Sequence, residues 1–414
     1  MERLLIKHIG LLATPLGREA ARGERQGAIS MTKDAWLLCE DGLVAACGTG
    51  KAPETDAETL DAQGKLVTPG LVDAHTHLVF GGWRQNELGL KLHGASYLEI
   101  LAQGGGILST VRATRAASEQ ELFDKGAAAL AEMLRMGVTT AEAKSGYGLD
   151  WENERKQLRV IQRLDREQPV ELAATFLGAH AVPAEYKDRR EEYIRLLCEE
   201  MLPAVAREGL AAFCDVFCET GVFSAGESRR ILEAGRHCGL IPKIHADEID
   251  PIGGSVLAGE LGAISAEHLI VCPPEGIAAM AKGGTVACCL PATSFYLGST
   301  FAPVRDMITA GVPVALASDF NPGSCPSLNL QFVMNLGCLK YRMTPEEVLT
   351  AVTLNAAAAI DRAGRIGSLE AGKQADLVVW DAPDLDYICY RMGSNLVSQV
   401  VKKAKSCSDS QNER

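Results

Sequence analysis

An alternation of two kinds of segment between residues 67 and 364 constrains the fold of this chain more than any other feature. Short runs rich in β-branched and apolar residues alternate with longer segments that carry apolar residues at three- and four-residue spacing, as in 119–136 and 191–208. The first kind predicts strands and the second predicts amphipathic helices, so the region indicates repeated βα units. We predict eight strands, at residues 71–77, 137–143, 170–179, 213–219, 241–246, 263–269, 285–291 and 312–318.

Eight consecutive βα units fit a closed (β/α)8 barrel better than an open doubly wound sheet. We therefore expect an α/β protein whose main domain, residues 67–364, is a TIM barrel. The helix after the eighth strand has a clear start signal, because Thr344 can cap it, Pro345 suits its first turn and Glu347 completes a capping box.

The two ends of the chain carry strand patterns without the intervening helices. In residues 1–66, Asp41-Gly42 separates two apolar runs, which predicts a β-hairpin with a two-residue turn. Residues 365–405 supply further strand patterns, and neither end alone is long enough to bury a core. We expect both ends to pair into one small β-sandwich domain, followed by a disordered tail at 406–414.

Composition narrows the class of partner. The net charge of −12 argues against nucleic acid, because proteins bind nucleic acids through basic surfaces. No run approaches the roughly 18 apolar residues of a membrane span, and the first residues are charged too early for a secretory signal. The thirteen cysteines stand in apolar contexts without a CxxC pair, so we interpret them as reduced, mostly buried thiols. These features favour a cytoplasmic protein that acts on a small molecule.

Histidines gather at the ends of the predicted strands. The first strand ends in an HxH sequence, and residues two apart on a strand point to the same side. Of the eight histidines in the chain, the five at or just beyond a strand's C-terminal end are His75, His77, His180, His245 and His268. Active sites of parallel barrels lie at this end.

Three of these histidines and one carboxylate form a candidate metal site. His75, His77 and His245 offer neutral nitrogens, and Asp319 follows the eighth strand. This set suits Zn²⁺ or iron, and a metal with an open position lowers the pKa of bound water from about 15.7 towards 7. An isolated HxH is often structural, but the strand-five and strand-eight residues favour metal. We expect Asp73 to support the site from behind.

Glu248, His268 and Asp319 are the candidates for proton transfer. His268 stands at the end of the sixth strand, where it could also be a core histidine with its hydrogen bonds satisfied. Glu248 follows His245 by three residues and could merely be solvated. Their positions at strand ends favour the catalytic alternative.

These motifs resemble the amidohydrolase superfamily. The sequence DAHTH at 73–77, the fifth- and sixth-strand histidines and the eighth-strand aspartate match its pattern, and the flanking strands match its composite β-sandwich. Five further motifs, in order along nearly the whole chain, are similar to the branch that opens the ring of 4-imidazolone-5-propanoate in histidine degradation. They are GGGILSTV at 104–111, KSGYG at 144–148, FLGAH at 176–180, HADE at 245–248 and SDFNPGS at 318–324.

The resemblance implies hydrolysis to N-formimidoyl-L-glutamate, a homodimer, and a metal held by the four ligands above. Arg84 and Tyr147 would bind the substrate, and the planar fork of Arg84 matches its propionate carboxylate. The remaining substrate residues implied by the resemblance are His180, Glu248, Asn321, Gly323 and Ser324. Without the resemblance, we would interpret Arg84 as a charge on a surface loop and Tyr147 as a packing residue. We expect the 104–106 segment to form a mobile loop near the mouth of the site.

The fourth strand predicts a single metal. The binuclear members that this superfamily resemblance brings in share a carboxylated lysine on the fourth strand, which bridges two metals. Residues 213–219 of this chain read FCDVFCE and contain no lysine. We therefore expect one Zn²⁺ or Fe³⁺ per subunit. In the expected mechanism, hydroxide attacks the lactam carbonyl carbon, and the metal or a protonated His268 stabilises the oxyanion. A proton delivered to the ring nitrogen then breaks the C–N bond.

Two alternatives remain open at this point. One is an aminohydrolase of the same superfamily that acts on cytosine, guanine or a related ring and releases ammonia. Arg84 and Tyr147 discriminate, because a neutral base needs no carboxylate partner. The other is a catalytically silent scaffold, which would usually lack part of the metal set, and its test is metal content.

Overall fold

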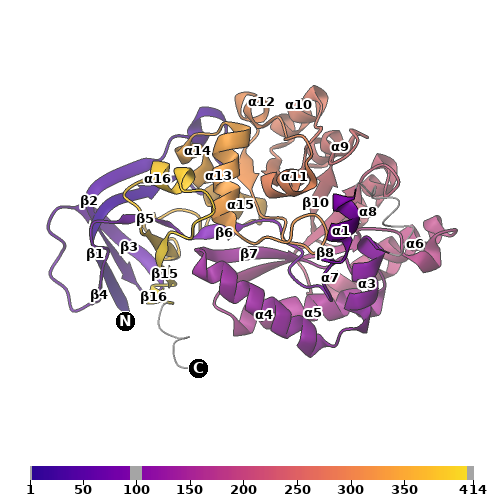
Figure 1. Cartoon of the computed structure of the whole chain (residues 1–414), viewed down its shortest axis with the longest axis horizontal. Coiled ribbons are helices and arrows are strands. Elements are labelled where there is room, and N and C mark those ends of the chain that lie inside the picture. Colours follow the sequence, from indigo (N-terminus) through magenta and orange to yellow (C-terminus); the bar gives the residue numbers. More distant parts are fainter. Residues whose placement is uncertain (1, 94–104, 408–414) are drawn as a thin grey trace.

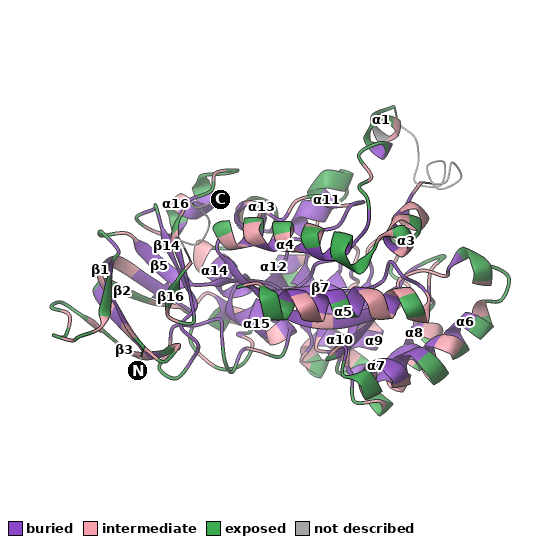
Figure 2. Ribbon diagram, turned by 90° about the horizontal axis from the view of Figure 1, so that it is seen from below, coloured by how far each residue is buried: buried purple, intermediate pink, exposed green. Residues whose placement is uncertain are grey.

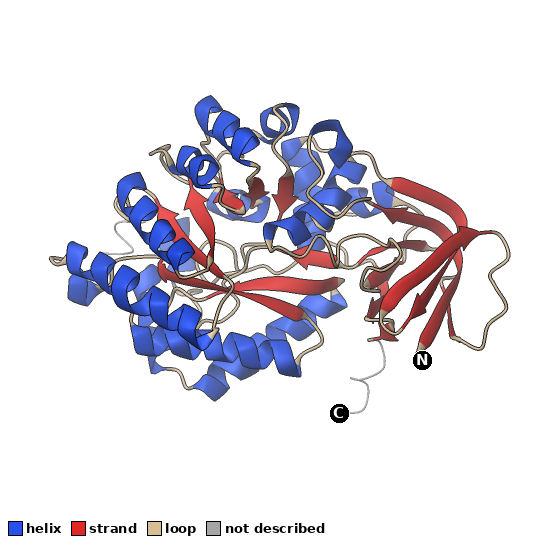
Figure 3. Cartoon of the chain, turned by 180° about the vertical axis from the view of Figure 1, so that it is seen from behind, coloured by secondary structure: helices blue, strands red, loops and turns tan. Residues whose placement is uncertain are grey.

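The computed structural model describes residues 2–93 and 105–407. An eight-stranded parallel barrel surrounded by helices forms one domain, and a sheet built from both chain ends forms a second domain beside it (Figures 1 and 3). This confirms the expected α/β class, the TIM barrel and the composite β domain. Expectations for residue 104 and for residues 408–414 of the expected tail lie outside the described residues. Ser406, the first residue of that expected tail, is the last residue of a short strand.

The barrel strands follow one another in chain order and pair in parallel. They are β6 (Leu71–Asp73), β7 (Val138–Lys144), β8 (Glu171–Ala179), β9 (Phe213–Cys218), β10 (Ile241–Ala246), β11 (Ser265–His268), β12 (Val286–Cys289) and β13 (Val314–Leu316). The prediction is confirmed for all eight, with one informative difference. Strand β6 ends at Asp73, so His75 and His77 lie beyond the regular strand and not within it.

Helices surround the barrel, and most of them bury their apolar sides and expose their polar sides (Figure 2). Two short helices instead expose apolar side chains, among them Leu92 and Phe295. The helices are α1 (Glu87–Leu92), α3 (Ile107–Ala116), α4 (Glu119–Arg135), α5 (Trp151–Glu167), α6 (Arg190–Leu196), α7 (Leu202–Glu208), α8 (Ala225–His237), α9 (Gly254–Leu261), α10 (Pro274–Gly283), α11 (Pro291–Leu297), α12 (Val304–Thr309), α13 (Leu330–Tyr341), α14 (Pro345–Ala351) and α15 (Leu354–Ala359). A π-helical turn joins α6 to α7. The capping box predicted at Thr344 is present at the start of α14. Among the described residues, no helix has the length and apolar character needed to cross a membrane.

The barrel closes through a short seam between the segments that follow β6 and β13. Thr76 and Phe320 form an isolated parallel bridge. On either side of it, the His77 amide donates a hydrogen bond to Phe320 O over 2.9 Å, and the Asp319 amide donates one to His75 O over 3.0 Å. The seam therefore places three of the expected metal ligands beside one another.

Both chain ends contribute to the second domain. Its strands are β1 (Arg3–Thr14), β2 (Ser30–Glu40), β3 (Leu43–Thr49), β4 (Glu58–Asp61), β5 (Leu66–Pro69), β14 (Leu377–Trp380), β15 (Val397–Lys402) and β16 (Lys405–Ser406). Strand β14 pairs with β5, which joins the two ends, and helix α16 (Leu385–Tyr390) follows β14. The hydrogen bonds form one eight-stranded sheet, and β1 pairs with β4 near its start and with β5 near its end. The Asp41-Gly42 hairpin turn is present, with both residues at positive φ.

All thirteen cysteines are free thiols and most are buried, as expected for a reduced protein. Burial raises the pKa of the Cys39 thiol to about 12 and that of Cys218 to about 11, so these groups are protonated at neutral pH. The structure therefore gives them a packing role.

Glu171, the first residue of β8, ties the two domains together. Lys402 Nζ on β15 lies 2.8 Å from its carboxylate and 2.7 Å from Asp376 Oδ2. Burial alone would raise the pKa of Glu171, but Lys402 and its neighbours outweigh burial and lower that pKa. A carboxyl group whose pKa is lower in the folded state stabilises the fold above its unfolded pKa and loses this effect as the pH falls.

We expect Glu171→Gln to lower the free energy of unfolding by about 1–2 kcal/mol at pH 7. The difference from wild type should shrink as the pH falls below about 4, where the unfolded carboxyl becomes protonated. Thermal denaturation at several pH values measures both effects. Glu192→Gln, which removes an exposed partner of Arg189, is the matched control and should have little effect. An equal loss at every pH would contradict the electrostatic explanation.

Candidate metal centre and active site

Four side chains converge at the C-terminal end of the barrel, where the sequence predicted a metal site. One ligand atom from each of His75, His77 and His245 lies within 4.8 Å of the other two, and the same holds for the trio His75, His268 and Asp319. Asp319 Oδ1 lies 3.5 Å from His75 Nε2 and 3.6 Å from His77 Nε2. The structure therefore brings together all four expected ligands and places His268 beside them.

The donor atoms of this cluster fit a metal ion. Within the described residues, His75 Nε2, His245 Nε2 and Asp319 Oδ1 are buried and make no hydrogen bond. Buried polar atoms without partners are rare in folded proteins, because each costs about 1–3 kcal/mol. Three nitrogens and one carboxylate oxygen around one point are the ligand set of a transition metal such as zinc or iron.

Buried carboxylates orient two of the histidines from behind. Glu267 Oε2 lies 2.9 Å from His75 Nδ1, and Asp215 Oδ2 lies 3.0 Å from His245 Nδ1. A carboxylate at Nδ1 favours the proton on that nitrogen and leaves Nε2 as the free ligand. Asp73 instead accepts the Ser318 amide over 3.0 Å, so it supports the segment before Asp319.

Two lysines stabilise these carboxylates inside the barrel. Lys144 Nζ lies 2.8 Å from Asp215 Oδ2 and 2.9 Å from Glu142 Oε2, and Lys243 Nζ lies 2.9 Å from Glu142 Oε1 and 3.4 Å from Glu267 Oε1. All five side chains are fully buried. Burial alone would lower the pKa of Lys144, but Asp215 and Glu142 outweigh it and raise that pKa. The lysine is therefore held as an ammonium ion.

Burial controls the protonation of the histidines. It lowers the pKa of His75 and His77 well below the usual range, with nearby charged groups adding to the effect. Burial also lowers the pKa of His180 to about 3. These side chains are neutral at pH 7, as metal ligands and uncharged contacts require. For His245, burial is outweighed by Asp215, which raises its pKa and favours the Nδ1 proton.

Asp319 stands where the chain turns after β13. Its backbone has a φ of 56°, in the left-handed region, and its Oδ2 accepts a hydrogen bond from Thr293 Oγ1 over 2.6 Å. Thr293 therefore occupies one carboxylate oxygen and leaves Oδ1 facing the histidines. Burial raises the pKa of Asp319 in this site, and an adjacent cation would reverse that shift.

Glu248 and His268 form a pair beside the cluster. Glu248 Oε2 lies 3.6 Å from His268 Nε2. Burial raises the pKa of Glu248 to about 7 and lowers the pKa of His268 to about 4. Glu248 therefore exchanges a proton near neutral pH, which suits a general base and acid. With this pKa the resting His268 imidazole is neutral at pH 7, and stabilisation of the oxyanion by the metal or by a protonated His268 stays a prediction.

Tyr147 and His180 line the side of the cluster next to His77. The His180 ring stacks on the His77 ring, with 4.9 Å between centroids, and the Tyr147 ring lies 5.3 Å from His180. His180 Nδ1 lies 3.0 Å from Gly146 O, so this nitrogen carries the proton and donates it to the carbonyl. Glu154, which the sequence reasoning missed, accepts the amides of Gly146, Gly148 and Leu149 and so shapes this loop.

Arg84 lies against the loop that follows β13. A Cβ added to Gly323 would come within 2.2 Å of Arg84 Nη1, so a larger residue here would displace the guanidinium from its present position. Glu87 holds the other edge of the fork, with Arg84 Nε and Nη2 donating to its two oxygens over 3.0 and 2.9 Å. Glu87 also accepts the amide of Gly106 over 2.8 Å. The structure thus connects the Arg84 loop to the glycine segment before α3.

Asn321 shapes the same β13 loop. Its Oδ1 accepts the amides of Gly323 and Ser324 over 2.8 Å each, and its Nδ2 donates to Asp319 O over 2.7 Å. Nδ2 also donates to Ser324 Oγ over 2.9 Å. These bonds give Asn321 a structural role in presenting Gly323 and Ser324.

Comparison with known proteins agrees with this site. Residues 66–407 match the Amidohydrolase family. An imidazolonepropionase of Alkaliphilus metalliredigens is 52% identical over 98% of both chains, and one of Streptococcus sanguinis is 51% identical over 97% of both. A zinc-bound adenosine deaminase structure from Xanthomonas campestris shares the fold, with a TM-score of 0.71 and 20% identity over 97% of this chain and 92% of that one.

The fold and the site thus define a metal-dependent hydrolase of the barrel type, and the chain belongs to the amidohydrolase family. Within that family its curated relatives are imidazolonepropionases, which confirms the resemblance seen in the five motifs.

We expect Glu267→Gln to weaken metal binding by about 10–100-fold while the fold is retained, because His75 loses the carboxylate that orients it. Competition with a chelator, with bound metal counted by mass spectrometry, measures the affinity, and circular dichroism checks the fold. Glu219→Gln is the matched control, since Glu219 is also buried but accepts backbone amides of Thr220, Ile249 and Asp250. Equal metal affinity in the two variants would contradict the orienting role.

Proposed function

We propose that this chain hydrolyses the ring C–N bond of 4-imidazolone-5-propanoate to N-formimidoyl-L-glutamate. One observation carries the proposal: a histidine and carboxylate metal site and an arginine fork stand together at one end of the barrel in a chain 52% identical to an imidazolonepropionase. The fork matches the propionate carboxylate, and the ligand set matches metal-assisted hydrolysis.

The metal would be a single Zn²⁺ or Fe³⁺, held by His75, His77, His245 and Asp319. A bound ion would act as a Lewis acid that lowers the pKa of a water molecule to about 7 and polarises the carbonyl group. The charge state of the buried Lys144 supports a single ion. A bridging carbamate requires a neutral amine, whereas Lys144 is held as an ammonium by Asp215 and Glu142.

Arg84 would bind the propionate through its Nη1 edge, since Glu87 occupies the Nε and Nη2 edge. Tyr147 and His180 would contact the ring on the side of His77, and Gly323 and Ser324 would line the opposite wall. Asn321 would act by holding that loop. These contacts would hold the ring carbonyl carbon beside the metal ligands. Holding the reacting groups in the right geometry accelerates the reaction, because the entropy cost of bringing them together is met on binding.

Glu248 would take a proton from the attacking water and return it to the departing ring nitrogen. Its pKa of about 7 permits both steps at neutral pH. His268, neutral at this pH, would donate its N–H to the developing oxyanion. Asp319 would serve chiefly as a ligand, because Thr293 and the seam already fix its orientation.

The cytosine or guanine aminohydrolase alternative shares the metal ligands. Arg84 disfavours it, because a partly buried fork paired with Glu87 on one edge offers its other edge to an anion and not to a neutral base. The homodimer and the cytoplasmic location stay predictions from the resemblance and the composition.

We expect metal-replete protein to consume freshly prepared 4-imidazolone-5-propanoate, and Arg84→Ala to raise KM by about 100-fold, because a charge-assisted bidentate pair contributes roughly 2–3 kcal/mol. Loss of substrate absorbance measures the rate, with a no-enzyme control for spontaneous decay. Arg112→Ala, on the outer helix α3, is a control charge removal. Absence of turnover by the metal-replete wild type would overturn the proposal, and cytosine and guanine are the next substrates to assay.

We expect Glu248→Gln to lower kcat by about 10²–10⁴-fold with metal content unchanged. In the wild type, activity should fall as the pH drops below about 7, because protonated Glu248 cannot accept a proton. This acidic limb should disappear in the residual activity of the variant. Retention of the same limb would assign the titration to another group.

A further inference from the structure

A lysine from α4 contacts the loop that carries Arg84. Lys125 Nζ donates a hydrogen bond to Gly82 O, and it lies 3.6 Å from the centroid of the Phe80 ring and 4.3 Å from that of Trp83. Aromatic faces attract a cation at these distances. One ammonium group therefore holds three points of the segment 80–84, which is defined here as the arginine loop.

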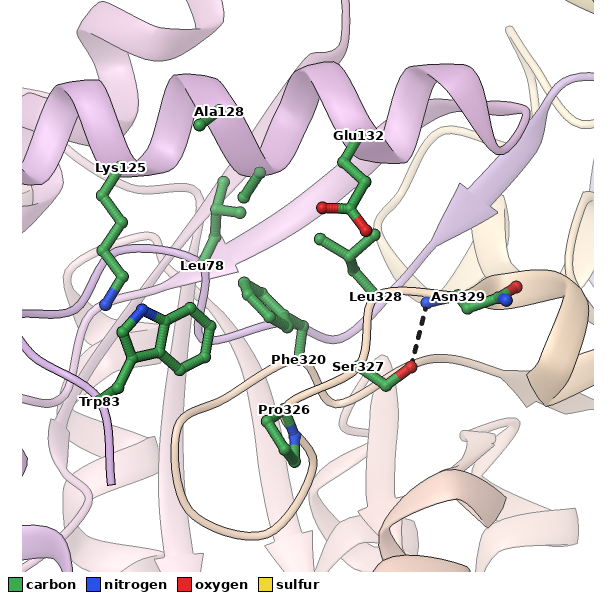
Figure 4. Close-up of a pocket in the computed structure, with 11 residues that line it drawn as sticks. Leu78, Trp83, Lys125, Ala128, Glu132, Phe320, Pro326, Ser327, Leu328 and Asn329 are labelled. Atoms are coloured by element: carbon green, nitrogen blue, oxygen red, sulfur yellow. Dashed lines mark hydrogen bonds between the residues drawn. The ribbon is translucent and has the colours of Figure 1, made fainter. Parts of the chain in front are cut away.

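The same contacts extend to the metal ligands. The Phe320 ring lies 5.8 Å from Phe80 and 6.0 Å from Trp83, and Phe320 directly follows Asp319. Figure 4 shows Lys125 reaching from α4 to Trp83 at one end of a pocket of about 400 Å³, with Phe320 between the helix and the β13 loop. The aromatic cluster thus joins the arginine loop to the seam of the barrel.

Besides Lys125, Thr114 holds the arginine loop, since its Oγ1 accepts a hydrogen bond from the Gly81 amide over 2.9 Å. The loop contains the pair Gly81-Gly82, and Gly82 has a φ of 68°. Glycine has more backbone conformations to lose than any other residue, so fixing this loop costs conformational entropy. Burial lowers the pKa of Lys125 to about 7, while both rings and the Gly82 carbonyl favour its ammonium form.

We propose that Lys125 is a positioning residue that holds the arginine loop so that the Arg84 fork is placed before the substrate carboxylate arrives. The proposal rests on the proposed function only for the identity of that carboxylate. Positioning in advance lowers the entropy cost of binding, so its loss appears in KM and not in the chemical step.

The first test is steady-state kinetics of Lys125→Met with 4-imidazolone-5-propanoate. We expect KM to rise about tenfold while kcat stays within about twofold, which corresponds to about 1.4 kcal/mol of binding. Lys125→Arg keeps the cation over both rings and should restore most of the KM. Lys340→Met is the matched control, since Lys340 lies 5.3 Å from the Phe301 ring, away from the arginine loop, and should match the wild type.

A double-mutant cycle separates positioning from general damage to the fold. If Lys125 acts through Arg84, then Lys125→Met should add no further increase in KM to the Arg84→Ala variant. An additive increase, or a fall in kcat without a change in KM, would overturn the proposal.

Amide hydrogen exchange of peptides covering the arginine loop tests the same proposal without substrate. We expect exchange to accelerate at least about tenfold in Lys125→Met but not in Lys340→Met. An inactive wild type with accelerated loop exchange in Lys125→Met would overturn the proposed function and support the positioning role. Unchanged exchange in Lys125→Met would overturn the positioning role whatever the activity.

Discussion

The closure of the barrel by two backbone hydrogen bonds is the constraint on which the site depends. The His77 amide pairs with Phe320 O, and the Asp319 amide pairs with His75 O. Because these bonds fix the register between the first and last barrel segments, they bring two imidazoles and one carboxylate together. On its other side each segment pairs with its neighbour in the sheet, since the Lys144 amide donates to Thr76 O and the Ala317 amide donates to Cys289 O. The seam therefore completes the ring of strands at the point where the ligands stand.

The interior beneath the cluster is charged, which is costly in a barrel core. Burial of a charge in protein is compensated only when partners and hydrogen bonds satisfy it. Here two ammonium groups alternate with three carboxylates across β7, β9, β10 and β11, and two of the carboxylates continue to the histidines. This buried polar network is less stabilising than an apolar core would be, but it keeps His75 and His245 in the tautomers that suit a metal.

Sequence reasoning found the parts of the fold and site that depend on local order. Strand and helix periodicity gave the eight barrel strands, and the position of His245 or Asp319 at a strand end marked it as a ligand. It missed the partners of the ligands, because contacts between Glu267 and His75 cross the barrel and depend on which side chains point inward. A signal was present, since charged residues such as Glu142 and Lys144 stand two apart in otherwise apolar strands. The burial that lowers the pKa of His268 is likewise a property of the folded chain, which local sequence does not show.

The composite sheet has a consequence for how the chain folds as it is made. Strand β5 can hydrogen-bond to β14 only after residues 377–380 leave the ribosome, although β1, β2 and β3 emerge first. During synthesis of the whole barrel, the edge of β5 therefore lacks its neighbour, and exposed strand edges pair readily with other chains. The docking of β14 covers this edge only when synthesis of the chain is almost finished. The risk of aggregation through β5 therefore lasts until that point.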